Sequence, residues 1–309
     1  MSGAPVPVIV NCASGTGHGT DQCAMLEGLF RDAGMQVRIL SPREGEPLTE
    51  LAEREARGKP PLIVAGGGDG TISAVASALA GTGIALGILP LGTLNHFARD
   101  LGVSLDIPQA VRDIAAGRTH EVDVGEVNGR VFVNNSSMGL YPHMVHQRDK
   151  RRRLLGVGKW RAMLWASLKV LRWYPFVDVS LNLEGKQKAL RTPFVFVGNN
   201  EYEMQGSDLG KRKCLDHGLL SVYLAPTTGR LGLLMLALRG LFGGLAKGRD
   251  FEMTQVAAAQ IRPHRRTHKK KRMLVSTDGE VTAMDTPIEY RVRPKALRVI
   301  VPAASAGAA

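Results

Sequence analysis

Two consecutive strand–loop–helix units in residues 61–98 constrain the fold more than any other stretch of this chain. In the first, the apolar run 62–65 leads into the loop GGGDGT (66–71) and then into an alanine-rich segment with helical character. In the second, the apolar run 84–89 leads into the loop PLGTLN (90–95). Glycines at the start of a helix leave consecutive N–H groups free to point at an anion. Both loops are therefore predicted to bind phosphate.

A third glycine-rich loop, NCASGTGHGT (11–20), follows the apolar strand predicted at 6–10. Ser14, Gly15 and Thr16 offer hydroxyl and backbone donors to a phosphate, and a plain tight turn is the alternative. Neither of the two loops in residues 61–98 matches the Walker A pattern or the G-x-G-x-x-G pattern. The loops therefore indicate phosphate binding without selecting either of those folds.

Strands alternate with helices four times before residue 100. The predicted strands at 6–10, 37–40, 62–65 and 84–89 are separated by helical segments that include 21–33 and 47–57. This alternation predicts an α/β nucleotide-binding domain over residues 1–124, built on a doubly wound, mostly parallel sheet. In such sheets, ligands bind at the carboxyl ends of the strands.

Near residue 125 the pattern changes to a period of two, which predicts antiparallel strands. Asn128 and Gly129, between two such runs, indicate a hairpin. Further strands are predicted at 177–183, 193–197, 219–224, 255–261, 273–277, 288–292 and 297–301. Together they predict a second, β-rich sandwich domain over residues 125–309, whose C-terminal tail is a candidate to return to the first domain.

The chain carries 40 Lys and Arg against 28 Asp and Glu, a formal net charge of +12 at pH 7. This excess suits an anionic partner. A segment at 149–176 mixes four consecutive basic residues with tryptophans, which favours an anionic membrane surface; packing of its apolar stripe on the β-rich domain is the alternative. A basic run at 261–273 is either a solvated loop or a binding surface.

Cysteine usage and the N-terminus bear on the compartment. The three cysteines have no paired spacing, and neither a signal peptide nor an apolar run of membrane-spanning length is visible. We therefore expect a cytoplasmic protein. With the basic, Trp-bearing segment, we expect it to associate peripherally with membranes.

Two acids flank a glycine in the segment STDGEV (276–281), namely Asp278 and Glu280. In a strand or tight turn, acids two positions apart can face the same way. Alone this is a weak signal, since Asp-Gly is foremost a turn dipeptide.

The order of the motifs along the chain resembles that of the diacylglycerol kinase catalytic-domain family, and within it the soluble bacterial lipid kinases. The segments that carry the resemblance are N-x-x-S-G at 11–15, GGGDGT at 66–71, L-P-x-G-T-x-N at 89–95, V-D-V-G at 122–125, D-H-G-L at 216–219 and D-G-E at 278–280.

The resemblance implies an enzyme that uses ATP and Mg²⁺ to phosphorylate a lipid hydroxyl, in a cleft between the two domains. It implies Asp278 as general base with Glu280 as its neighbour, and it implies Asp69 and Asp123 as acids that organise Mg²⁺. The residues that it places on the nucleotide are Asn11, Ser14, Gly15, Thr16, Gly67, Gly68, Asp69, Gly70, Thr71, Gly92, Thr93 and Asn95.

The sequence departs from the family at a structural Mg²⁺ site. The resemblance would build this site from His217 with the backbone oxygens of Cys214 and Leu219, yet relatives commonly carry Asp where this chain has His217. Imidazole is a poor ligand for Mg²⁺. Two alternatives stay open: the site is empty, or Asp216 substitutes.

Three functions are compared on these grounds. A kinase acting on diacylglycerol or a related lipid is favoured, with contact to an anionic membrane. A kinase similar to NAD kinases shares the GGDGT loop, but the DGE segment and the Trp-bearing basic segment argue against it. A non-catalytic basic binding protein is the third; no nucleic-acid partner is expected, because no helix-turn-helix, RNP or zinc pattern occurs. A homodimer is expected from base rates only.

Overall fold

The computed structural model describes residues 4–10, 19–139, 177–203, 210–212, 214–224, 252–263 and 272–303. Three features named above therefore lie outside the described residues. They are the first glycine-rich loop at 11–18, the Trp-bearing basic segment and most of the basic run, at 264–271. Within the part of the chain that is described, no helix has both the length and the apolar character needed to cross a bilayer.

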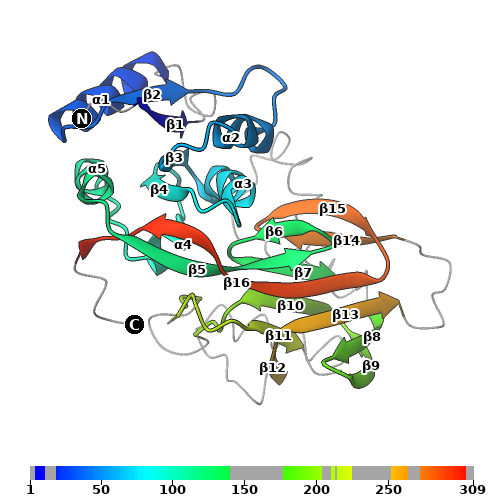
Figure 1. Ribbon diagram of the computed structural model, residues 1–309. Helices are drawn as coiled ribbons and strands as arrows, with labels where there is room; N and C mark the ends of the chain where they lie inside the picture. The colour runs from blue at the N-terminus through cyan, green and yellow to red at the C-terminus, as the bar shows by residue number, and fades with distance from the viewer. Residues whose placement is uncertain are drawn as a thin grey trace, which may run out of the picture.

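Parallel strands flanked by helices form the N-terminal unit, as the alternation predicts (Figure 1). The parallel strands run in the order β2-β1-β3-β4. Their bounds are β1 Val6–Val10, β2 Val37–Leu40, β3 Leu62–Gly67 and β4 Ala85–Pro90. The helices are α1 Gly19–Asp32, α2 Leu48–Ala56, α3 Asp69–Leu79, α4 His96–Asp100 and α5 Ile107–Ala116.

The sheet of this unit continues into strands from the second half of the chain. Strand β16 (Ile288–Ile300) lies parallel to β4 and antiparallel to β5 (Thr119–Val127). Beyond β16 the order continues through β13 (Ala258–Pro263), β8 (Val177–Leu183) and β9 (Lys186–Thr192), while β6 (Arg130–Phe132) pairs with β5. The α/β class with a β-sandwich is confirmed, and its first sheet is mixed, with ten strands among the described residues.

A second, antiparallel sheet of six strands completes the β-sandwich. Its order is β12 (Glu252–Val256), β11 (Leu220–Leu224), β10 (Phe194–Asn199), β7 (Asn135–Gly139), β14 (Arg272–Thr277) and β15 (Glu280–Asp285). Apolar side chains of both sheets share one core, in which Leu181 and Ile261 of the first sheet join Val195 and Val222 of the second. A separate core lies under α1 to α5 and includes Leu297 and Val299 of β16.

Two expected strand assignments are wrong in opposite ways: one predicted strand is two strands, and two predicted strands are one. The run 255–261 is two strands that part at Ala257, since β12 belongs to the second sheet and β13 to the first. Conversely, 288–292 and 297–301 belong to one strand, β16, which keeps β5 as its neighbour through an irregularity between Arg293 and Leu297. Lys295 has φ +50° there, so a local distortion replaces the expected break.

Turn chemistry fixes the hairpin that joins β5 to β6. Asn128 and Gly129 have φ values of +46° and +82°, the left-handed pair that a two-residue hairpin turn requires. Val127 therefore faces Arg130, and the predicted hairpin is confirmed. The Asn128 amide also donates 2.8 Å to the carbonyl of Asp285, which ties the hairpin to β15.

Candidate active site

The two described glycine loops lie backbone against backbone at the carboxyl ends of β3 and β4. A Cβ atom at Gly92 would sit 2.4 Å from the Cα of Gly68 and 2.7 Å from the side-chain oxygen of Asn95. Such contacts have no room for any side chain, so glycine is required at this crossing. The two loops thus form one surface of exposed backbone beside the start of α3.

Asn95 holds the second loop in shape. Its backbone adopts φ +52°, and its side chain is almost fully buried. The side-chain oxygen accepts the N–H of Gly92 at 3.0 Å, and the amide donates to the carbonyls of Gly92 and Pro90 at 2.8 and 3.3 Å. All these bonds are internal to the loop, so the structure uses Asn95 to shape the loop around Thr93.

Replacing Asn95 by Ala is expected to lower the free energy of unfolding by about 2 kcal/mol, since buried loop groups lose their partners and Ala is strained at positive φ. Denaturant unfolding measures this change. The matched control is Asn182→Ala, which removes a single exposed bond from Gly185 N–H in the β8–β9 turn. Equal losses in both variants would contradict the role given to Asn95.

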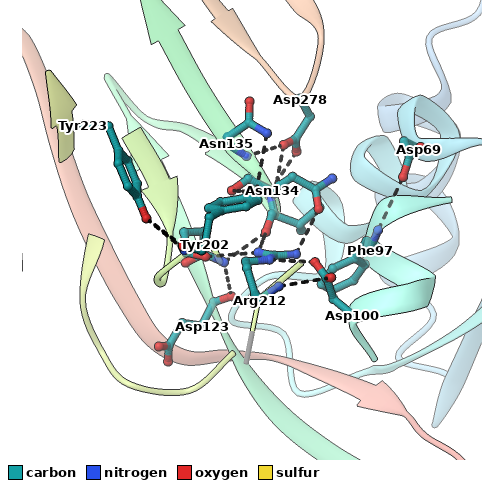
Figure 2. Close-up of polar contacts among 12 residues, drawn as sticks. Asp69, Phe97, Asp100, Asp123, Asn134, Asn135, Tyr202, Arg212, Tyr223 and Asp278 are labelled. Atoms are coloured by element: carbon teal, nitrogen blue, oxygen red, sulfur yellow. Dashed lines mark hydrogen bonds and ion pairs between the residues drawn. The ribbon is translucent and has the colours of Figure 1, made fainter. Parts of the chain in front are cut away.

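Asp69 is the first residue of α3, and its side chain reaches α4. Its Oδ1 atom accepts the N–H of Phe97 at 3.4 Å (Figure 2). The carboxylate is half-buried, and this single long bond leaves most of its acceptor capacity free. Asp69 can therefore serve an oxygen-seeking cation beside the glycine loops.

Asp278 lies in the tight turn between β14 and β15, where it has φ +47°. Its Oδ1 accepts the N–H groups of Asn134 and Asn135 at 2.9 and 3.0 Å, and its Oδ2 accepts that of Val133 at 2.8 Å (Figure 2). Burial raises the pKa of Asp278, and these backbone donors oppose that effect without cancelling it. Asp278 is half-buried. A carboxyl with a raised pKa that lines a groove is a frequent feature of catalytic sites.

A groove of about 510 Å³ brings α3 and the β14–β15 turn together. Gly70 and Ser73 line it from α3, and Asp278 and Glu280 line it from the turn. Glu280 is largely exposed and pairs with Arg130, which also lines the groove. The two acids that the sequence singles out thus open on one groove beside the first described glycine loop.

The predicted metal ligands do not come together. Asp123 is buried, and its two oxygens accept the N–H groups of Lys295 and Gly218 at 2.9 and 2.6 Å. Figure 2 shows Arg212 between Asp123 and Asp69. Among the described residues, no group of three or more His, Cys, Asp or Glu side chains could hold a metal ion.

The segment around His217 does not fit Mg²⁺. The thiol of Cys214 donates to Asp216 at 2.6 Å, and the N–H of His217 donates to Asn200 at 3.2 Å. Imidazole suits transition metals, whereas Mg²⁺ selects oxygen. Of the two predicted backbone ligands, the Leu219 carbonyl accepts the N–H of Asn200 at 3.1 Å. The backbone here is held by protein contacts, and Asp216 is engaged by the thiol.

Sequence reasoning missed the most buried ion pair of the site. Arg212 and Asp100 pair at 2.8 Å with side chains 0% and 4% exposed. Burial alone would lower the pKa of Arg212, but neighbouring charges, Asp100 among them, raise it. In the sequence Arg212 lies in KRK between two lysines and reads as a solvated charge, so only the fold identifies it.

Glycine loops beside a groove lined by a half-buried acid suit an enzyme that transfers phosphoryl groups. Comparison with known proteins shows the family. A diacylglycerol kinase catalytic domain matches residues 5–127, and a YegS C-terminal NAD kinase beta sandwich-like domain matches residues 142–301. The chain belongs to the family of YegS-like lipid kinases that these two domains define.

Two relatives illustrate the similarity, and the first is named as a lipid kinase. The chain is 31% identical to a "Probable lipid kinase YegS-like" of Pseudomonas aeruginosa over 89% of its own length and 88% of the relative. It is 28% identical to an uncharacterized Synechocystis protein, sll0036, over 78% of its own length, and the match spans only 55% of that relative.

Two solved structures share the fold. A diacylglycerol kinase from Bacillus anthracis superposes with a TM-score of 0.69 at 22% identity, covering 97% of this chain and 98% of the other. Yeast NADH kinase complexed with NADH superposes with a TM-score of 0.52 at 10% identity, covering 97% and 84%. At these identities the likeness concerns the fold alone.

Proposed function

We propose that the protein transfers the γ-phosphoryl group of ATP to a hydroxyl of diacylglycerol or a related lipid. One observation carries the proposal: the groove beside the glycine loop of α3 is also lined by Asp278, a half-buried acid from the other half of the chain. Kinase family membership supplies the nucleotide, and the lipid-kinase relatives suggest the acceptor.

In this reaction the acceptor oxygen forms a bond to the γ-phosphorus while the bond from that phosphorus to the β,γ-bridging oxygen breaks. Backbone N–H groups of residues 67–71 and 92–93 would hold the phosphates, because a loose transition state needs positioning and charge stabilisation more than a strong base. Asp69 would hold Mg²⁺ with the nucleotide, and the bound ion would neutralise phosphate charge.

Asp278 takes the proton of the acceptor hydroxyl in this scheme, and ADP leaves. Its Oδ2 accepts one backbone N–H, so a second lone pair remains for the proton. An aspartate is too weak to ionise an alcohol beforehand and accepts the proton late, as the bond to phosphorus forms. Glu280 and Arg130 stand at the rim of the groove.

The rate is expected to fall with acidification at a higher pH than an ordinary aspartate would give. Burial raises the pKa of Asp278, and only the ionised carboxylate accepts a proton. Activity is therefore present above the raised pKa and is lost as the pH falls through it. The pH profile of kcat/KM measures this limb; a limb at or below about pH 4, the ordinary aspartate value, would contradict the assignment.

The proposal is tested by transfer of labelled γ-phosphate from ATP with Mg²⁺ to a panel of lipids in mixed micelles, with NAD in parallel. Labelling of one lipid and not of NAD supports it. Labelling of NAD alone would replace it with a nucleotide kinase, and labelling of nothing by a folded, ATP-binding protein would favour a non-catalytic binding role.

Contact with an anionic membrane is the second part of the proposal, and the net charge of +12 supports it. Vesicle sedimentation with anionic and with neutral phospholipid is the measurement. Stronger binding to the anionic vesicles, weakened by salt, is expected. Equal binding to both kinds of vesicle would show that the positive charge of the protein does not drive membrane binding.

A further inference from the structure

The peptide segment 133–135 is held from two sides. On one side, its three N–H groups all donate to Asp278, at 2.8 to 3.0 Å. On the other side, its carbonyls accept bonds: that of Val133 from Arg212 at 2.6 Å, and that of Asn134 from the Tyr202 hydroxyl at 3.0 Å. The position of the Asp278 carboxylate thus depends on groups that never touch it.

Asn199 also holds the far side, since its side-chain amide and its N–H donate to the carbonyls of Val133 and Asn134 at 3.1 and 2.9 Å. The charged donors on this side come from Arg212. Its Nη1 also donates to the carbonyl of Asn199 at 3.1 Å, and its Nη2 donates to the side-chain oxygen of Asn134 at 2.9 Å. A guanidinium is planar and directs its donors in a fixed fork, so one side chain can hold several acceptors at set angles.

The other end of this arrangement is α4, which begins next to the second glycine loop. Arg212 Nε donates to Asp100 at 2.8 Å, and its guanidinium lies over the ring of Phe97, 5.8 Å from the centroid. Phe97 in turn donates its N–H to Asp69. Figure 2 shows these groups as a continuous set from Asp69 to Asp278.

We propose that Arg212 is a positioning residue for Asp278, because it fixes segment 133–135 against α4 and so sets the acid relative to the glycine loops. The inference rests on the proposed function for its catalytic meaning only. Arg212 itself touches no reactant in this scheme. Its role is to keep the peptide groups that bind Asp278 aligned.

The structural arm of the test is amide hydrogen exchange, which needs no substrate. In Arg212→Met, the amides of residues 133–135 should exchange about tenfold faster, because the segment loses the charged hydrogen bonds that hold its far side. Arg212→Lys keeps the positive charge but lacks the planar fork of donors. Its exchange rates at residues 133–135 should lie between those of the wild type and of Arg212→Met. The control is Arg112→Met on α5, where the arginine is exposed and bonds Gln109.

A double variant separates positioning from stability. Arg212→Met alone leaves Asp100 buried without its partner, which destabilises the fold, whereas Arg212→Met with Asp100→Asn removes both charges. The double variant should recover thermal stability while exchange at 133–135 stays fast. Protection that returns together with stability, or that never changes in any variant, would overturn the proposal.

The kinetic arm uses the lipid labelled by the wild type. In the double variant, kcat per folded molecule should fall by about tenfold or more while KM for ATP stays within about twofold, as expected for a displaced catalytic group with intact loops. Fast exchange with unchanged kcat would overturn the catalytic meaning of the positioning. A wild type that labels no lipid would refute the proposed function instead, and the exchange arm would still decide the role of Arg212.

Discussion

Replacing Asp278 by Asn is expected to lower kcat for phosphate transfer by about a thousandfold, within the range for loss of a general base. Asparagine tolerates the positive φ of this turn, so the backbone can stay as it is. However, an amide cannot accept the acceptor's proton, and its NH₂ group would face one or more of the N–H groups that the carboxylate binds.

The measurement is kcat per folded molecule, with the folded fraction taken from thermal unfolding and ATP binding measured separately. Asp285→Asn is the matched control, because Asp285 is an exposed acid of the same hairpin whose side chain is 80% accessible. If the Asp278 variant only unfolds more easily while its folded fraction keeps full kcat, the acid is a structural residue of the turn.

Replacing Gly92 by Ala is expected to raise KM for ATP by about a hundredfold, since displacement of binding groups by an ångström has effects of this size. The added methyl group would sit 2.4 Å from Gly68, where the obstacle is backbone that cannot rotate away. One loop must move, and both loops contribute N–H groups to the proposed phosphate site. A loss of about 1 to 3 kcal/mol in unfolding free energy should accompany the change.

Gly28→Ala is the control for this glycine. Gly28 lies in α1, and a Cβ atom there would meet no atom within 4 Å. Alanine should stabilise that helix slightly, by about 1 kcal/mol, and leave KM unchanged. An unchanged KM in Gly92→Ala as well would show that the crossing of the two loops has no part in nucleotide binding.

Local patterns were sufficient to predict much of the fold. The apolar runs and glycine loops around β3 and β4 specify strand, turn and helix within a few residues. The pair Asn128-Gly129 favours a two-residue hairpin turn, because both residues accept a positive φ. These features depend on neighbours in sequence. For the same reason Asp69 and Asp278 were identified as candidates, since each lies in a short motif.

Long-range partners were beyond such reasoning. Nothing around Ala257 signals that the chain changes sheets there, and nothing near Arg293 signals that one strand continues past a distortion. Asp123 was expected to serve a metal; its two oxygens accept the N–H groups of Gly218 and Lys295, about a hundred or more residues away, and no local motif indicates these partners. The burial of the Arg212 side chain likewise depends on partners that are distant in the sequence.

The place of β16 also bears on how the protein folds during synthesis. Residues 297–299 lie beside β4 and β5, although the polypeptide that forms β4 leaves the ribosome about two hundred residues earlier. Until β16 emerges, the N-terminal unit has an unpaired strand edge and an incomplete core. We expect this unit to depend on chaperones or to wait for the rest of the chain, and pairing over so long a separation to make folding slow.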